Sequence, residues 1–258
     1  MDEVTACKAL AREFRTYLGA EEKVVFPVEG SDLLTAFGMD RLLKETGEYI
    51  GATKPHVAGS LFVKRYYCQV PLAALYSITQ LQRSFDFSLA NLSFGFDEDR
   101  QWCIRIKHTQ MSVCPPQDRE RWRQEHVYRL FTETVGPVFR TVAQRTGVGM
   151  STLWAHLSFA VYHRYELWLK GATFEAERRR IHDDFHFLTS DAPAGWFEGV
   201  EQNPFAEEYV YFPHPKEEGT SVRLRQKCCF NYCLPEGRYC YTCPGLSEEE
   251  RVQKIIGA

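Results

Sequence analysis

Five cysteines lie in one stretch, residues 227–245, KCCFNYCLPEGRYCYTCPG, out of nine cysteines in the 258-residue chain. Two are adjacent, Cys228 and Cys229, and two form a C-x-x-C pair, Cys240 and Cys243. Thiolates gathered in this way bind zinc, hold an iron–sulfur cluster or exchange electrons as dithiols. The stretch is therefore the first candidate for chemistry in this chain.

The compartment of the protein bears on what such thiols do. The first residues, MDEVTACKALAREFRTYLGA, carry charges throughout and contain no apolar core of a secretory signal. No window approaches 18 uncharged apolar residues, so we expect no integral membrane segment and a cytoplasmic location. Thiols stay reduced there, which favours metal or redox chemistry over disulfides. The scattered cysteines are expected to be small buried hydrophobic residues: Cys7, Cys68, Cys103 and Cys114.

The spacing favours an iron–sulfur cluster over zinc without deciding between them. A zinc site usually combines two C-x2–4-C hooks, whereas one half of this set is a direct Cys-Cys pair. Adjacent side chains of an extended chain point to opposite faces, so Cys228 and Cys229 need a local bend to reach one ion. A [2Fe–2S] cluster is a larger target, because each of its two irons takes two protein sulfurs. Redox thiols without metal remain a third reading.

The full pattern, C-C-x10-C-x2-C, resembles the C-terminal signature of the ferric siderophore reductases, the FhuF-like family. The basic residues before the pair, the LP-x-G turn and the Pro after the last Cys are also similar to that family. The resemblance implies a [2Fe–2S] cluster on Cys228, Cys229, Cys240 and Cys243. Cys233 stands where the family pattern would have Arg, and we expect it to be a bystander thiol rather than a replacement ligand.

The resemblance implies reduction of Fe(III) to Fe(II) in a siderophore complex of the hydroxamate or citrate-hydroxamate type, a role in iron uptake and homeostasis. Alternating cations predict a docking surface for an anionic complex if their strands are neighbours: Arg223, Arg225, Lys227, Arg105 and Lys107. The other reading of these cations is the wet face of a half-buried sheet. Trp154 is a weaker match to the family, and it either stacks on the substrate or belongs to the core.

The net charge and the motifs outside the cysteine stretch restrict which partners and ligands we expect. A net charge of −3 argues against nucleic acid as a main partner. No segment carries the strand–turn–helix context of a nucleotide-binding loop, so electrons are expected from a separate ferredoxin or NAD(P)H-dependent reductase. His182 and His186 in HDDFH share a helical face but have no evident third ligand, and we expect an ordinary polar surface.

The hydrophobic periodicity predicts an α+β protein in which helices pack around a small central antiparallel sheet, with the cysteine-rich segment at the end. Strands are expected over 85–96 and 101–108, with a turn between them. Helices are expected over 3–18, after a cap at Ser31, over 56–82 with a kink near Pro71, over 118–134 and 138–146 on either side of Pro137, after a cap at Ser151, over 174–188 and after Ser247.

Two parts follow from this pattern, a mixed body over residues 1–219 that binds the ferric siderophore and a cluster-binding segment over 220–258. Functions of other classes stay open beside the reductase. The cysteines would also suit a structural zinc in an interaction module, or an iron–sulfur sensor that binds a protein partner. A role near siderophore assembly is a further alternative, because siderophore synthetases carry a distantly similar domain.

Overall fold

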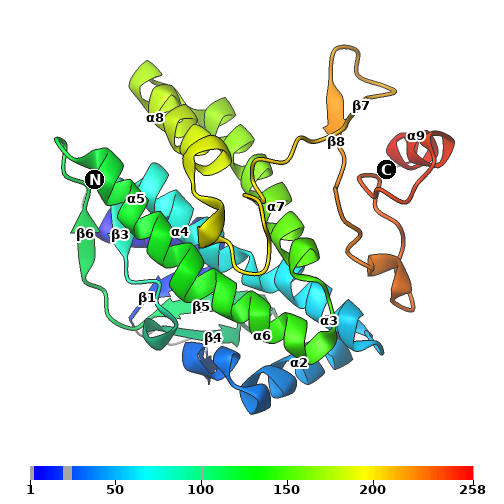
Figure 1. The fold of residues 1–258 in the computed structure, drawn as a ribbon, viewed down its shortest axis with the longest axis horizontal. Coiled ribbons are helices and arrows are strands. Elements are labelled where there is room, and N and C mark those ends of the chain that lie inside the picture. Colours follow the sequence, from blue (N-terminus) through cyan, green and yellow to red (C-terminus); the bar gives the residue numbers. More distant parts are fainter. Residues whose placement is uncertain (1–2, 20–24, 100, 258) are drawn as a thin grey trace.

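The computed structural model describes residues 3–19, 25–99 and 101–257 and confirms the predicted α+β class. A layer of helices covers a small sheet, and the last part of the chain runs down one side of the helical body (Figure 1). The helices are α1 Glu3–Phe14, α2 Ala36–Ile50, α3 Pro55–Phe62, α4 Gln69–Thr79, α5 Arg119–Arg129, α6 Gly136–Thr146, α7 Met150–Gly171, α8 Glu175–His186 and α9 Glu248–Ile256.

The main sheet has four strands in the order β1-β5-β4-β2. Their bounds are β1 Thr16–Leu18, β2 Val25–Glu29, β4 Leu92–Phe96 and β5 Trp102–Ile106. The predicted hairpin is confirmed, since β4 and β5 pair antiparallel from Leu92–Ile106 to Phe96–Trp102. The expectation of a purely antiparallel sheet is wrong, because β1 pairs with β5 in parallel. The predicted helix over 3–18 ends at Phe14, where Arg15 takes a positive φ of 47° and turns the chain into β1.

Two further pairs of strands lie outside the main sheet. β3 Arg83–Phe85 pairs with β6 Met111–Val113, and β7 Tyr211–Pro213 pairs with β8 Ser221–Arg223. The predicted strand over 85–96 is confirmed only at its two ends, because residues 86–91 form no strand and contain a short 3-10 turn, η3 Leu89–Asn91, in front of β4. The expected division between residues 219 and 220 falls in the turn of the β7–β8 hairpin.

The predicted kink in the segment 56–82 is a π-helical turn, η2 Val63–Tyr67, between α3 and α4. Pro71 follows in the first turn of α4, where its missing N–H is tolerated. The helical segments α3, η2 and α4 follow one another as one rod. This rod supports the sheet, because Phe62 of α3 packs edge-on against Trp102 of β5, with ring centroids 6.0 Å apart. At its other face, η2 carries Lys64 and Arg65 toward the C-terminal segment.

The helical half departs from prediction mainly at its boundaries. Pro137 does not interrupt the helix. α5 continues through a second π-helical turn, η4 Leu130–Val135, and Pro137 lies in the first turn of α6. Ser31 lies in the 3-10 turn η1 Gly30–Leu34, and Thr35 caps α2 instead, its Oγ1 accepting from the Gly38 N–H at 3.0 Å. The cap of α7 is Gly149 rather than Ser151.

Short helical turns complete the path to the C-terminal segment. They are η5 Phe187–Asp191, η6 Ala194–Trp196 and, within the cysteine stretch, η7 Asn231–Cys233. The predicted last helix is confirmed with its capping box, since Ser247 Oγ accepts from the Glu250 N–H at 3.2 Å and Glu250 Oε2 accepts from the Ser247 N–H at 2.9 Å. No helix in the described parts of the chain is long and apolar enough to cross a membrane.

Candidate functional site

The cysteine segment is anchored to the helical body through Cys229. This residue is buried in a small apolar cluster with Val57 and Leu61 of α3. Its carbonyl oxygen accepts a hydrogen bond from Ser60 Oγ at 3.2 Å, and Ser60 in turn lies 2.8 Å from Nε2 of His156 on α7. Burial, followed by the positive charges of Arg225 and Lys64, lowers the pKa of His156 to about 3. A neutral buried histidine thus connects the segment to two helices.

The bend that the adjacent cysteines require lies directly after them. Phe230 has a left-handed backbone, with φ 60° and ψ 15°, which is uncommon for a bulky residue. Its N–H donates to Cys228 Sγ at 3.3 Å, and the backbone N–H of Asn231 donates to Cys229. The strained residue therefore turns two backbone donors toward two sulfurs.

The spacer between the two halves of the motif is a compact loop. The predicted LPEG turn is confirmed, because the Gly237 N–H donates to the Leu234 carbonyl at 2.9 Å. A Cβ at Gly237 would lie 1.9 Å from the Asn231 carbonyl oxygen, so only glycine fits there. The Asn231 side chain accepts from Arg65 at 2.6 Å and donates to the Arg238 carbonyl at 3.0 Å, which ties the loop to η2.

The second half of the motif is closed by its own turn and held by the last helix. The Cys243 N–H donates to the Cys240 carbonyl at 2.9 Å. Arg251 of α9 is buried and donates to the carbonyls of Tyr241 and Cys243 at 2.5 and 2.9 Å. The C-x-x-C pair is thus fixed by hydrogen bonds on both sides.

The four sulfurs form two pairs. Cys240 is the hydrogen-bond partner of Cys229, and Cys243 is the partner of Cys228. The bond from Cys240, with further help from Lys64, lowers the pKa of Cys229 to about 4, and the pKa of Cys240 is raised correspondingly. Burial is the main cause that raises the pKa of Cys228. Among the described residues, no three Cys, His, Asp or Glu side chains converge as ligands of one ion.

These features fit a two-iron cluster better than a single ion. A [2Fe–2S] cluster takes two protein sulfurs on each iron, whereas a structural zinc takes four ligands on one centre. Each of three sulfurs also has a polar partner from the chain, which is a lever on a cluster's potential: a backbone N–H on Cys228, Lys64 on Cys229 at 3.0 Å, and the Thr242 hydroxyl on Cys240 at 3.4 Å.

Cys233 lies next to this set without joining either pair. It is half-buried, packs against the small group of apolar side chains around Val57 and Leu61, and interacts with the Tyr232 hydroxyl. Three tyrosines of the segment lie at its surface: Tyr232, Tyr239 and Tyr241 are 40%, 39% and 47% exposed. Tyr232 and Tyr239 stack with ring centroids 4.3 Å apart. Of the scattered cysteines, Cys68 and Cys103 are buried as predicted, and Cys7 and Cys114 are half-buried.

The predicted row of cations before the cysteines is wrong for Arg223 and Arg225. Arg223 is buried, pairs with Glu166 of α7 at 2.5 Å and lies over the rings of Phe159, Tyr162 and Tyr209. Arg225 stacks on Phe159 at 3.9 Å. β8 ends at Arg223, so the alternation that would have placed all three cations on one wet face is lost. Lys227 alone is exposed.

The other predicted docking residues also lie elsewhere. Arg105 lies in β5 of the main sheet and Lys107 directly follows it. This sheet does not include β8, so a joint surface of five cations does not form. Arg105 donates to Ser93 Oγ and Lys107 pairs with Glu29, both at 2.8 Å. Trp154 is fully buried and donates from Nε1 to the Glu198 carbonyl at 2.9 Å, so it belongs to the core.

Sequence reasoning missed the residues that receive the cysteine segment. Ser60 and Lys64 lie one helical turn apart on the same face of the α3–η2 rod, and the segment that they bind is 169 and 165 positions away. Only the i, i+4 spacing of a polar pair in an apolar helix was visible beforehand. His182 and His186 are exposed, as expected of a polar face, although Asp184 between them is buried.

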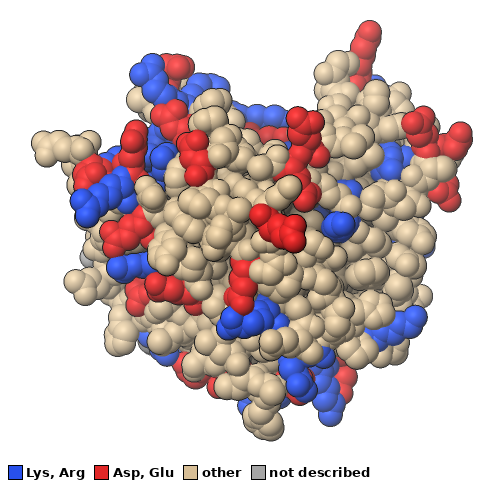
Figure 2. All heavy atoms as spheres, in the orientation of Figure 1, with Lys and Arg blue, Asp and Glu red and all other residues tan. Residues whose placement is uncertain are grey.

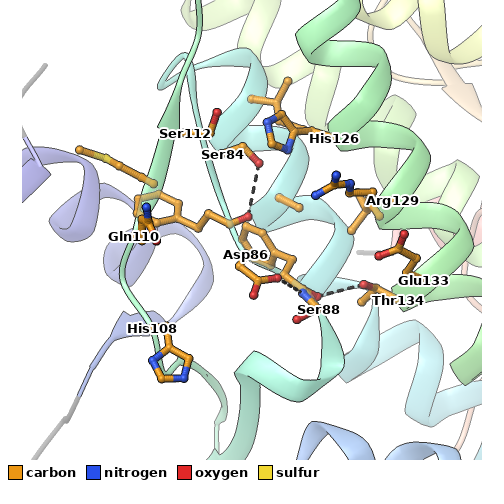
Figure 3. Close-up of a pocket in the computed structure, with 16 residues that line it drawn as sticks. Ser84, Asp86, Ser88, His108, Gln110, Ser112, His126, Arg129, Glu133 and Thr134 are labelled. Atoms are coloured by element: carbon orange, nitrogen blue, oxygen red, sulfur yellow. Dashed lines mark hydrogen bonds between the residues drawn. The ribbon is translucent and has the colours of Figure 1, made fainter.

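A cavity of about 510 Å³ opens at the other end of the same rod, between α4, α5 and the β3–β6 pair (Figure 3). His126, Arg129 and Glu133 approach it from the α5 side. Ile78 on its floor is 14 residues from Lys64, which corresponds to roughly 20 Å along a helix. A second cavity, of about 320 Å³, lies beside Trp154. No residue of the cysteine segment lines either one.

Comparisons with known proteins add no family to this geometry. No protein-family model matches the chain, and no curated protein matches it.

Proposed function

We propose that this protein is a cytoplasmic ferric siderophore reductase that holds a [2Fe–2S] cluster on Cys228, Cys229, Cys240 and Cys243. The arrangement of the thiols as two pairs, Cys229 with Cys240 and Cys228 with Cys243, is the observation that carries the proposal. Two pairs match the needs of two irons, and the resemblance of the motif to the FhuF-like proteins points to the same cofactor.

When bound, the cluster supplies a one-electron relay: one electron from a donor protein converts one Fe(III) of the siderophore complex to Fe(II), and no bond within the siderophore is formed or broken. The chain contributes the positions of the four sulfurs, the backbone donors of Phe230 and Asn231, and the cation of Lys64. Fe(II) binds hard oxygen donors less strongly than Fe(III), so its formation favours release of the metal.

Docking belongs to the exposed side of the segment rather than to the buried arginines. Lys227 and Arg238 are exposed in this segment, which also carries the stacked pair Tyr232 and Tyr239. Cations and tyrosines suit an anionic complex with an apolar backbone, such as a ferric citrate-hydroxamate or hydroxamate. On the face drawn in Figure 2, acidic and basic side chains are interspersed, and this face has no broad basic stripe of the kind that nucleic acids bind.

The test is the reoxidation of the reduced protein by ferric complexes. The protein, reduced with dithionite without air and freed of excess reductant, is mixed with a citrate-hydroxamate, a trihydroxamate and a catecholate complex of Fe(III). We expect reoxidation with formation of one Fe(II) per cluster, fastest with the hydroxamate-containing complexes. A reduced cluster that passes electrons to none of the three would contradict the reductase and favour a sensor.

A further inference from the structure

Two cations lie behind the cysteine pair without a carboxylate. Lys64 Nζ is 3.0 Å from Cys229 Sγ, and its side chain is half-buried. Arg225 lies flat on the Phe159 ring, and its backbone N–H donates to Thr242 between Cys240 and Cys243 at 2.9 Å. Within the described ranges of the chain, neither cation forms an ion pair with Asp or Glu. Both cations lie near enough to the buried His156 and Cys68 to act on their pKa values.

Polar atoms without partners lie beside these cations. Nε of Arg225 and both amide atoms of Gln226, Nε2 and Oε1, are buried and have no hydrogen-bond partner among the described residues. A buried polar atom without a partner costs about 1–3 kcal/mol, and native proteins contain few of them. Other buried atoms without a partner lie elsewhere in the described part of the chain, among them Nε of Arg119 and Arg123, but three of them fall together in the two residues before Lys227, which points to a group outside the polypeptide at this place.

The surroundings determine which charge such a group carries. Arg225 is half-buried without an acidic partner among the described residues, and the anion nearest to Lys64 is the Cys229 sulfur, so a group that these cations favour is an anion bound through that sulfur. Four thiolates around a two-iron, two-sulfide core carry a double negative charge, which becomes triple after uptake of one electron. The cations of Lys64 and Arg225 therefore interact more strongly with the reduced cluster than with the oxidised one.

We propose that Lys64 and Arg225, together with the Gln226 amide, form the counter-charge side of the cluster site and raise its reduction potential. This inference rests on the proposed function. Lys64 acts through Cys229 and is a positioning residue that favours the reduced state, so that a mild cytoplasmic donor suffices to load the electron. Arg225 adds charge from behind the C-x-x-C turn.

The test compares the midpoint potentials of Lys64→Gln and Lys227→Gln with that of the wild type, after reconstitution and measurement of iron and sulfide. Both variants remove one lysine charge, but Lys227 is exposed and donates to no sulfur. We expect wild-type cluster content in both. The Lys64→Gln cluster should be about tenfold harder to reduce, a shift of about 59 mV to lower potential. Lys64→Arg should restore the potential, and Lys227→Gln should leave it unchanged.

The possible results distinguish failure of this inference from failure of the proposed function. A Lys64→Gln protein with full cluster content and the wild-type potential would overturn the inference and leave the proposed function intact. A wild type that holds no iron and sulfide would overturn both. If Lys64→Gln does not assemble a cluster, Arg225→Gln takes its place: a lower potential supports the counter-charge, and an unchanged one contradicts it.

Discussion

Two groups of buried or half-buried charge in this molecule differ in what balances them. Between α5 and α8, Asp184 is 2% exposed and accepts from Arg119 at 2.7 and 2.8 Å and from Arg123 at 3.0 Å. Beside the cysteines, Lys64 and Arg225 have no carboxylate of their own within the part of the chain that the structure describes. The first group balances its charge inside the polypeptide, whereas the second needs an anion from outside.

The difference separates a structural network from a binding site. The Asp184 carboxylate accepts a bidentate pair of hydrogen bonds from Arg119 and one from Arg123, and these arginines balance its charge without a ligand. Near Cys229, Lys64 contacts a thiol, Arg225 precedes the unpartnered amide of Gln226, and both cations act on neutral His156. Substitutions in the two groups should therefore affect different observables.

The largest effect on stability is expected from Asp184→Asn. The change leaves Arg119 and Arg123 buried without a counter-ion, and it should lower the free energy of unfolding by about 3–5 kcal/mol. Urea unfolding of the purified protein measures it. Asp183→Asn is the matched control, because that side chain is exposed and its change should stay within about 0.5 kcal/mol. If both substitutions lowered the free energy of unfolding equally, Asp184 would not be the centre of a buried charge network, and the contrast with the cations near Cys229 would be lost.

Arg223→Ala comes next, because it breaks the bond to Glu166 and the contacts with Phe159 and Tyr162 that hold β8 on α7, together with the contact with Tyr209. We expect a loss of about 2–3 kcal/mol in the free energy of unfolding. Arg179→Ala, an exposed arginine on α8, should change it by less than about 0.5 kcal/mol. A raised KM for a ferric complex with unchanged stability would instead return Arg223 to the docking surface.

The neutral state of His156 predicts a pH dependence of stability in the protein without cluster. Its pKa is about 3 in the folded protein, against about 6.5 when unfolded, so between these values the unfolded chain binds more protons. Stability should therefore fall as the pH falls below about 6.5, by about 2 kcal/mol at pH 5 from this residue. Urea unfolding at about pH 6.5 and at pH 5 should show a smaller loss in the free energy of unfolding for His156→Gln than for the wild type. An identical loss would contradict the assignment of this pH dependence to His156.

The smallest effect on stability is expected from Lys227→Ala and Arg238→Ala on the exposed side of the segment. Each should change the free energy of unfolding by less than about 0.5 kcal/mol, because neither side chain holds a buried partner. The double variant should nevertheless raise the KM for an anionic ferric complex several-fold, and the effect should shrink at high salt. A KM that does not change would place the docking surface elsewhere.

Local chemistry made part of this structure predictable. The Ser247–Glu250 capping box, the LPEG turn and the β4–β5 hairpin each depend on residues within a few positions of one another. The need for a bend at the cysteine pair also followed from backbone geometry, and Phe230 provides it.

Contacts between distant segments were not predictable in this way. The parallel pairing of β1 with β5, the bond from Lys64 to Cys229 and the burial of Arg223 against Glu166 all depend on the tertiary fold. Alternating charge in residues 223–227 indicated a wet strand face, but β8 ends at Arg223 and aromatic side chains of α7 cover the first two arginines. Aromatic rings that accept a guanidinium are visible only once the helix and the strand are adjacent.

The metal and acid-labile sulfide content of the protein, purified without air, tests the central claim most directly. The account predicts about two irons and two sulfides per chain, with a visible absorption that bleaches on reduction. The same content should remain in Cys233→Ser and be lost in Cys229→Ser. A colourless protein with one zinc per chain and no sulfide would contradict the account.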